Sequence, residues 1–279
     1  MAQNLRHIQQ KDCFSRFQDI NTMAQDKITI INFSNVYKEE KFYNNTATEW
    51  IDCSDISGAD CFCDNEATDE IRRRLKDVNI HGLHFIDSGN YHYISRFLTD
   101  KINETFTLLV FDHHPDMQPP LFEQMLTCGD WVKSVLDTNK NVDKVVLVGA
   151  SDQLIDRIPE EYATRMICFP ESQLNDRQAW QTFYDMHLNH PIYISVDKDV
   201  LSPNDDTTNW DQGIATLPQL KQLLVTLLRH NRLIGVDICG ECDYSIRGLL
   251  DKNIRENDHV NKELLNVVGS YTKRNGKIQ

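Results

Sequence analysis

Two stretches of the sequence combine carboxylates and imidazoles at a spacing of two residues. The first places Asp112, His114 and Asp116 directly after an apolar run, and the second places Asp197 and Asp199 after another. In extended backbone, residues two apart point to the same side, so each stretch delivers its carboxylates to one point. The resulting repulsion between like charges becomes tolerable when a cation binds there. These residues therefore predict a metal site.

The alternative interpretation is that these Asp residues only cap the turns that follow the two apolar runs. A single D-x-H-x-D match also arises by chance in a chain of this composition, which is the risk that any short motif carries. A second acidic cluster, at the end of another apolar run, makes chance an unattractive explanation for the pair.

The elements that must position these residues are short apolar runs. Each run is rich in Ile, Val and Leu and nearly continuous, which is typical of strands that are buried on both faces. Seven strands are predicted, at Ile28–Phe33, Leu83–Ile86, Thr107–Phe111, Lys144–Gly149, Met166–Phe169, Ile192–Val196 and Leu233–Ile238.

Helical patterns alternate with these strands. Helices are predicted near Thr68–Lys76, Tyr91–Asn103, Leu121–Leu136, Asp176–Leu188 and Leu217–His230. Alternation of strands and helices favours a mainly parallel central sheet between two helical layers, that is, an α/β fold with three layers, α/β/α. In such sheets the functional site lies beyond the carboxyl ends of the strands, where both acidic clusters are expected.

The composition is that of a globular protein and excludes some classes of function. The 279 residues include 29 Asp and 13 Glu, and the formal net charge is −13. This acidity, with no stripe of Lys and Arg, argues against a nucleic-acid binder. No run of 18 apolar residues predicts a membrane span, and the first twelve residues lack the apolar core of a signal peptide. A cytoplasmic protein is expected.

The eight cysteines are expected to be reduced thiols in that compartment. The spacings Cys61-x-Cys63 and Cys239-x-x-Cys242 could each form half of a zinc site, but neither has a second pair at the usual distance. The alternative is that these cysteines are small buried side chains. There is no repeat and no linker, so the chain is interpreted as a single domain over 1–279.

Three motifs, read in order, resemble those of the arginase/agmatinase (ureohydrolase) family. The D-x-H-x-D motif of that family matches Asp112–Asp116, and its S-x-D-x-D-x-x-x-P motif matches Ser195–Pro203 at every fixed position. A glycine-rich turn that ends in a ligand histidine resembles Ser88–His92. The resemblance runs from about Gly82 to about Asp243 and implies the arginase/deacetylase-like version of the three-layer fold.

The resemblance also implies a metal centre and an activity. In the family, two Mn²⁺ ions bridged by hydroxide are held by six side chains, which correspond here to His92, Asp112, His114, Asp116, Asp197 and Asp199. The implied activity is hydrolysis, with the hydroxide attacking a guanidino or another linear, non-peptide C–N centre of a small molecule. Members of the family commonly form trimers or hexamers, so a homo-oligomer is possible.

The sequence departs from the family pattern at four places, three outside these motifs and one within the first of them. Cys128 stands where the family has a histidine for proton transfer, and it is either a substitute or a small buried residue. Glu241 comes one residue later than the family's substrate-binding Glu; it could reach the site through a bulge, although a shift of one residue reverses side-chain direction in a strand. A polar loop at 204–213, with one Trp, replaces a Gly/Pro-rich loop and is expected to shape the pocket.

His113, where the family has a small residue, is expected to turn away from His114 into packing.

Two other functions remain open at this point. The first is a metal-binding protein with the fold but no catalysis, which Cys128 and Glu241 suggest. The second is a zinc amidohydrolase on the related deacetylase fold, holding one ion. The additional carboxylates Asp116 and Asp199 count against that second alternative.

Overall fold

The computed structural model describes residues 27–120, 125–242 and 250–275. Several predictions fall partly or wholly outside these ranges: those on the N-terminal segment and Cys13, the first residues of the helix predicted at Leu121–Leu136, and the end of the family resemblance at Asp243. The single domain over 1–279 stays a prediction for the same reason.

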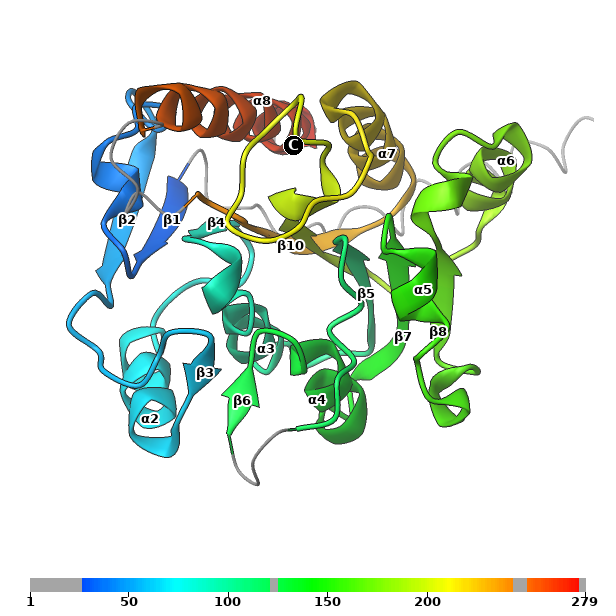
Figure 1. Ribbon diagram of the computed structural model, residues 1–279, viewed down its shortest axis with the longest axis horizontal. Helices are drawn as coiled ribbons and strands as arrows, with labels where there is room; N and C mark the ends of the chain where they lie inside the picture. Colours follow the sequence, from blue (N-terminus) through cyan, green and yellow to red (C-terminus); the bar gives the residue numbers. More distant parts are fainter. Residues whose placement is uncertain (1–26, 121–124, 243–249, 276–279) are drawn as a thin grey trace, which may run out of the picture.

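A parallel sheet of eight strands forms the centre of the described structure (Figure 1). Its strand order is β2-β1-β4-β10-β9-β5-β7-β8, and every neighbouring pair is parallel. The strands are β1 (Lys27–Asn32), β2 (Ala47–Asp52), β4 (Leu83–Ile86), β5 (Phe106–Phe111), β7 (Val142–Val148), β8 (Met166–Phe169), β9 (Ile192–Asp197) and β10 (Leu233–Cys239). The seven predicted strands are all confirmed, and β2 was missed.

Helices cover both faces of the sheet. Alternate residues of β5 show the two layers: Leu109 and Phe111 belong to the core that includes α7 and α8, whereas Leu108 and Val110 belong to the core that includes α2, α3 and α4. The predicted three-layer α/β/α fold is therefore confirmed. The helices are α2 (Asn65–Arg74), α3 (Ile94–Thr99), α4 (Trp131–Thr138), α5 (Asp152–Ile155), α6 (Arg177–Asp185), α7 (Leu217–His230) and α8 (Leu250–Asn275).

Among the predicted helices, α7 has the limits that were predicted, whereas the ends of α2, α3 and α6 differ from the predictions by one to four residues. Helix α7 has the predicted limits because Thr216 and Gln219 form a capping box at its start. The helix predicted over Leu121–Leu136 is wrong in its first half: the chain there forms β6 (Leu126–Thr127), which pairs antiparallel with β3 (Phe62–Cys63), and α4 begins only at Trp131. No helix in the described ranges is both long and apolar enough to cross a membrane.

Strand register brings three chemically active residues to one edge of the sheet. Phe111 of β5 is level with Val196 of β9, so the residues that follow them, Asp112 and Asp197, lie side by side. On the other side of β9, Asp197 is level with Cys239 of β10. This edge is the carboxyl end of the strands, where sites of parallel sheets form.

Candidate metal centre

The turn after β5 carries the first acidic cluster, and backbone geometry differs there from the predicted extended chain. The strand ends at Phe111, so simple alternation does not place the carboxylate of Asp116. Instead Asp116 has a left-handed backbone with φ of 49°. The indole Nε1 of Trp131, at the start of α4, donates a hydrogen bond of 2.6 Å to Asp116 Oδ2 and fixes this carboxylate.

His92 lies at the centre of one half of the cluster. It ends the 3₁₀ turn η2 (Gly89–Tyr91) that follows β4. Its Nδ1 lies 3.1 Å from Asp112 Oδ2, 3.3 Å from Asp116 Oδ2 and 3.5 Å from Asp197 Oδ2. Both His92 Nδ1 and Asp112 Oδ2 are buried, yet neither makes a hydrogen bond of acceptable geometry with any described residue. Their lone pairs converge on one point, as ligands of a cation do.

A chain of hydrogen bonds sets the tautomer of His92. Its Nε2 lies 2.9 Å from Ser195 Oγ, and the Ser195 hydroxyl donates to Asp237 Oδ1 at 2.6 Å. Because the single hydroxyl proton goes to Asp237, Ser195 accepts a hydrogen bond from the Nε2–H of His92, and Nδ1 of the same ring faces the carboxylates. Metal-bound histidines are usually oriented by such a partner. Ser195 was visible in the motif, but its role here was not predicted, nor was that of Asp237.

The second half of the cluster surrounds His114 and Asp199. His114 Nδ1 lies 2.8 Å from Asp199 Oδ2 and 3.6 Å from Asp112 Oδ1. The backbone N–H of His113 donates to Asp199 Oδ1 at 3.0 Å and orients that carboxylate. Asp112 therefore contacts the imidazoles of both halves, which is the position of a bridging ligand.

The carboxylates lie so close together that their mutual repulsion opposes the ionisation of all of them at the same time. Burial, with the charge of Asp112, raises the pKa of Asp116 to about 7. Burial, with the charges of Asp197 and Asp112, raises the pKa of Asp199 well above its usual value. Divalent cations would relieve this repulsion, so the donor set of oxygens and imidazoles fits metal ions such as Mn²⁺.

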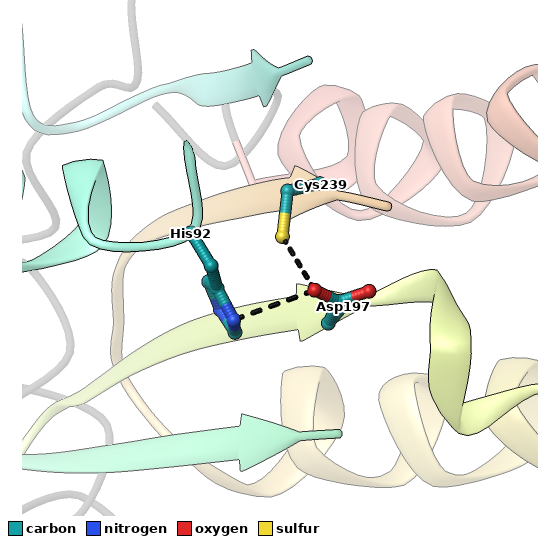
Figure 2. A group of neighbouring side chains, drawn as sticks. All are labelled: His92, Asp197 and Cys239. Atoms are coloured by element: carbon teal, nitrogen blue, oxygen red, sulfur yellow. Dashed lines mark hydrogen bonds and ion pairs between the residues drawn. The ribbon is translucent and has the colours of Figure 1, made fainter. Parts of the chain in front are cut away.

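The structure thus brings together the six residues that the family resemblance predicted as ligands. They fall into overlapping groups whose ligand atoms lie within 4.8 Å of one another: His92, Asp112 and Asp116 form one, and Asp112, His114 and Asp199 form another. A third group joins His92 and Asp197 to Cys239 (Figure 2). No described group contains two cysteines, so neither predicted zinc half-site is assembled from its own pair.

Cys239 is the residue of this cluster that sequence reasoning missed. It was considered only as half of a Cys-x-x-Cys pair. Its Sγ lies 3.2 Å from Asp197 Oδ2, and the side chain is completely buried. Cys239 is the last residue of β10 and is level with Asp197 of the neighbouring strand β9. Its position at the carboxyl end of a strand is the feature that could have identified it as part of the cluster.

Cys128 lies in the small antiparallel ladder beside the cluster. It follows β6, and its backbone N–H donates to the carbonyl of Cys61 at 3.0 Å. The two thiols also form a hydrogen bond with each other, and this bond together with burial raises the pKa of Cys128 far above its usual value. The thiol therefore stays protonated at neutral pH, and it is half-buried and within electrostatic range of Asp116.

Glu241 lies in a different environment from the cluster. Its Oε1 accepts hydrogen bonds from Lys198 Nζ and Asn261 Nδ2, both at 2.9 Å, and it is fully buried. The preceding Gly240, at the position of the family's Glu, has φ of 97°, and a Cβ there would lie 2.5 Å from Asp197 Oδ1. No side chain fits at position 240, and the side chain of Glu241 pairs with Lys198.

The polar loop at 204–213 lies against the open side of the cluster. The Trp210 ring lies 5.9 Å from the ring of His114, and its Nε1 donates to Asn90 Oδ1 at 2.9 Å. Asp211 Oδ1 lies 3.1 Å from His114 Nε2. A Cβ on Gly89 would meet Trp210 at 2.9 Å, so the glycine permits this close approach. The loop therefore contributes side chains to the approach to the cluster.

His113 is largely buried, but it does not turn fully away from its neighbour. Its Nδ1 lies 3.4 Å from Glu171 Oε2, which agrees with the expected packing. Its ring nevertheless remains 5.1 Å from that of His114, edge to face. Burial lowers the pKa of His113, and the charge of His114 lowers it further.

Comparisons with known proteins agree with this fold. The model of the Arginase family matches residues 22–240. An uncharacterized protein of Thermotoga maritima is 30% identical over 249 residues, 88% of this chain and 91% of the relative. Among solved structures, agmatine ureohydrolase of Thermoplasma volcanium has a TM-score of 0.63 at 12% identity, covering 94% of this chain and 95% of that one. The Mn²⁺₂ form of Trypanosoma cruzi formiminoglutamase has a TM-score of 0.61 at 11% identity, covering 91% and 96%.

Proposed function

Because this chain belongs to the arginase family, we propose that it is a hydrolase that uses two Mn²⁺ ions to cleave a linear, non-peptide C–N bond of a small molecule. A guanidino group is the expected target. The observation that carries the proposal is the convergence of four carboxylates and two imidazoles, from three segments of the chain, on one edge of the sheet. The names of the structural neighbours, which act on agmatine and formiminoglutamate, support the same class of chemistry.

Each of the six ligands has a place in the proposed centre. His92, Asp116 and Asp197 would hold one ion, and His114 and Asp199 would hold the other. Asp112 would bridge them because it belongs to both groups. Four carboxylates and two divalent cations give a neutral set of charges. When bound, such ions acidify water and supply a nucleophile near neutral pH.

The leaving nitrogen needs a proton, and Cys128 is the proposed donor. Its thiol stays protonated, and its position in the sequence matches that of the family's proton-transfer histidine. A general acid must carry its proton at the operating pH, as this thiol does, but it transfers the proton best when its pKa lies near that pH. The raised pKa therefore makes Cys128 a weaker acid than the imidazole of the family. Cys128→Ser should therefore lower kcat more than it changes KM, and Cys128→His should retain more activity than Cys128→Ser.

Trp210 and Asp211 are the proposed contacts of the substrate head group. A planar guanidinium can stack on an indole face, and such cation–π contacts are worth about 0.5–2 kcal/mol. Asp211 carries the complementary negative charge and lies beside His114. This arrangement replaces the family's Glu, whose position is occupied by Gly240. We expect Trp210→Ala to raise KM without changing the metal content.

A panel of guanidino compounds, formimino compounds and linear amides tests the proposal. Protein reconstituted with Mn²⁺ should release urea, an amine or ammonia from at least one compound, and Asp112→Asn should abolish the release. Asp143→Asn, on β7 and away from the cluster, is the matched control and should keep full activity. Product release that persists in Asp112→Asn would contradict the assignment.

A metal-binding protein without catalysis is the second candidate, and Gly240 is the observation that favours it. The family's substrate-binding carboxylate has no equivalent there, since Glu241 is engaged with Lys198. This candidate predicts metal uptake and ligand binding without any product across the same panel. Any turnover that depends on Asp112 excludes it.

A further inference from the structure

The thiol of Cys239 lies among the metal-ligating side chains of the cluster. Buried cysteines ordinarily pack among apolar atoms. Cys239 Sγ instead lies 3.2 Å from a carboxylate oxygen of Asp197, and its ligand atom is within 4.8 Å of that of His92. Figure 2 shows the three side chains pointing toward one another from the turn after β4 and the ends of β9 and β10. A sulfur, an oxygen and a nitrogen atom thus lie within 4.8 Å of one another.

A second observation, independent of the cysteine, marks the same point as a ligand site. His92 is only 1% exposed, and its Nδ1 has no hydrogen bond of acceptable geometry with any residue in the described ranges. Its nearest neighbours are Asp112 Oδ2 at 3.1 Å and Asp116 Oδ2 at 3.3 Å. Asp197 Oδ2, the oxygen that Cys239 also contacts, lies at 3.5 Å.

We infer that Cys239 supplies a thiolate ligand to the ion held by His92 and Asp197, so that the two halves of the metal centre differ chemically. This inference rests on the proposed function. Bonds of about 2.0–2.2 Å to nitrogen or oxygen and 2.3 Å to sulfur, at the angles of about 90–120° found around a five-coordinate ion, separate neighbouring ligands by roughly 2.9–3.8 Å. The Cys239–Asp197 and Asp197–His92 separations of 3.2 Å and 3.5 Å lie within that range.

The asymmetry has a consequence for metal preference. The half formed by Asp112, His114 and Asp199 offers only oxygen and nitrogen, which suits Mn²⁺. The half with Cys239 offers a soft ligand as well, which raises its affinity for Co²⁺, Zn²⁺ or Cd²⁺ relative to that of the other half. Binding there transfers the thiol proton to solvent as the metal–sulfur bond forms. The thiol otherwise donates its proton to Asp197 as an ordinary hydrogen bond.

A Co²⁺ titration of the metal-free protein, followed by absorption spectroscopy, tests the inference. The wild type should develop a sulfur-to-cobalt charge-transfer band in the near ultraviolet, and Cys239→Ser should lack it. Cys63→Ser is the matched control because Cys63 is equally buried but belongs to none of the ligand groups, so its band should remain. The loss of Cd²⁺ affinity in Cys239→Ser should be on the order of tenfold or more, the scale seen when a supporting residue is lost.

The outcomes separate this inference from the proposed function. Co²⁺ bound by the wild type without a charge-transfer band overturns the thiolate ligand and leaves the metal centre intact. Failure of the wild type to bind any divalent ion overturns both the thiolate ligand and the proposed metal-dependent function. A band that persists in Cys239→Ala, with circular dichroism unchanged, assigns the sulfur to another cysteine and also overturns the inference. Because the decisive spectrum is that of the wild type, poor folding of a variant does not remove the test.

Discussion

At the scale of single residues, the site depends on side chains that orient the ligands as well as on the ligands themselves. Ser195 joins the imidazole of His92 to the carboxylate of Asp237, and Ser95 Oγ donates to the same carboxylate oxygen at 3.0 Å. These groups are all buried, so their hydrogen bonds operate without competition from water. They orient the imidazole of His92 so that its other nitrogen, Nδ1, faces the carboxylates of the cluster.

Replacing Ser195 by Ala should therefore weaken metal binding without removing a ligand. Loss of such an orienting partner typically costs 10–100-fold in metal affinity. Calorimetric titration with Mn²⁺ measures the effect, and Ser134→Ala, on α4, is the control that should bind as the wild type does. Unchanged affinity in Ser195→Ala would show that the tautomer of His92 is set in some other way.

The six expected ligands were predictable from sequence because each of them belongs to a short motif, in which the spacing along the chain identifies the residue. Cys239 and the pairing of Glu241 were not predictable in this way. The role of Cys239 depends on the register between β9 and β10, which no local pattern reveals. The partner of Glu241 is a lysine 43 residues earlier in the chain, and Gly240 redirects the backbone between them.

At the scale of elements, α8 and β2 were missed for different reasons. The strand β2 is an edge strand whose residues are all half-buried or exposed, so it lacks the continuous apolar run of the central strands. Helix α8 is polar overall, and part of its buried face is amide rather than apolar: Asn257 donates to the carbonyl of Thr207, and Asn261 donates to Glu40 and Glu241. The spacing of apolar residues alone therefore does not predict such a helix.

The contact between α8 and the sheet surrounds a buried lysine. Lys198 Nζ lies 2.9 Å from Glu241, 3.4 Å from Asp206 and 2.6 Å from Asn257. Burial raises the pKa of Asp206 to about 7 although Lys198 opposes this. The lysine thus compensates carboxylates that have no access to water.

Lys198→Met should destabilise the metal-free protein by about 3–5 kcal/mol because it leaves those carboxylates without a cation. Urea denaturation of the metal-free protein measures the free energy of unfolding. The control is Lys221→Met, which removes a partly exposed pair with Glu263 between α7 and α8 and should cost less than about 1 kcal/mol. Equal effects of the two substitutions would contradict the role given to Lys198.

His84 on β4 should make the stability depend on pH. Burial lowers its pKa from 6.5 to about 4. Between these values the unfolded chain binds a proton that the folded chain does not, so stability falls as pH decreases from about 6.5 to about 4. The full contribution, reached below about pH 4, is on the order of 3 kcal/mol.

His84→Gln removes the titrating group and keeps a side chain that can reach the carbonyl of Ile80, the partner of His84. We expect its free energy of unfolding to fall less steeply than that of the wild type over this window. His187→Gln is the control for the substitution itself, because His187 is exposed. Parallel curves for the wild type and His84→Gln would rule out a pKa lowered by burial.

At the scale of the whole molecule, part of the acidity belongs to the proposed site. Two divalent ions would change the formal charge from −13 to −9. Because the ions bind only the folded arrangement of ligands, they also stabilise it: at a free metal concentration of 100 times Kd the gain is about 2.7 kcal/mol for each ion. For a chain of this size, each such gain corresponds to a rise in Tm of about 5 °C.

Thermal unfolding with Mn²⁺ and with a chelator measures this gain. The wild type should show the rise in Tm with Mn²⁺, and the chelator should reverse it. Asp112→Asn should show little response to either, whereas Asp143→Asn should respond as the wild type does. A rise in Tm of the same size in Asp112→Asn would place the stabilising ion elsewhere on the protein.

The metal stoichiometry of the purified protein tests the central claim most directly. After dialysis against Mn²⁺ and removal of free metal, elemental analysis should find two ions per wild-type chain. Asp112→Asn should lose both ions because the bridging ligand is gone, and Asp199→Asn should lose at least one. A wild type that retains no Mn²⁺, or a content that neither substitution changes, would contradict the assignment of this cluster as a dinuclear metal centre.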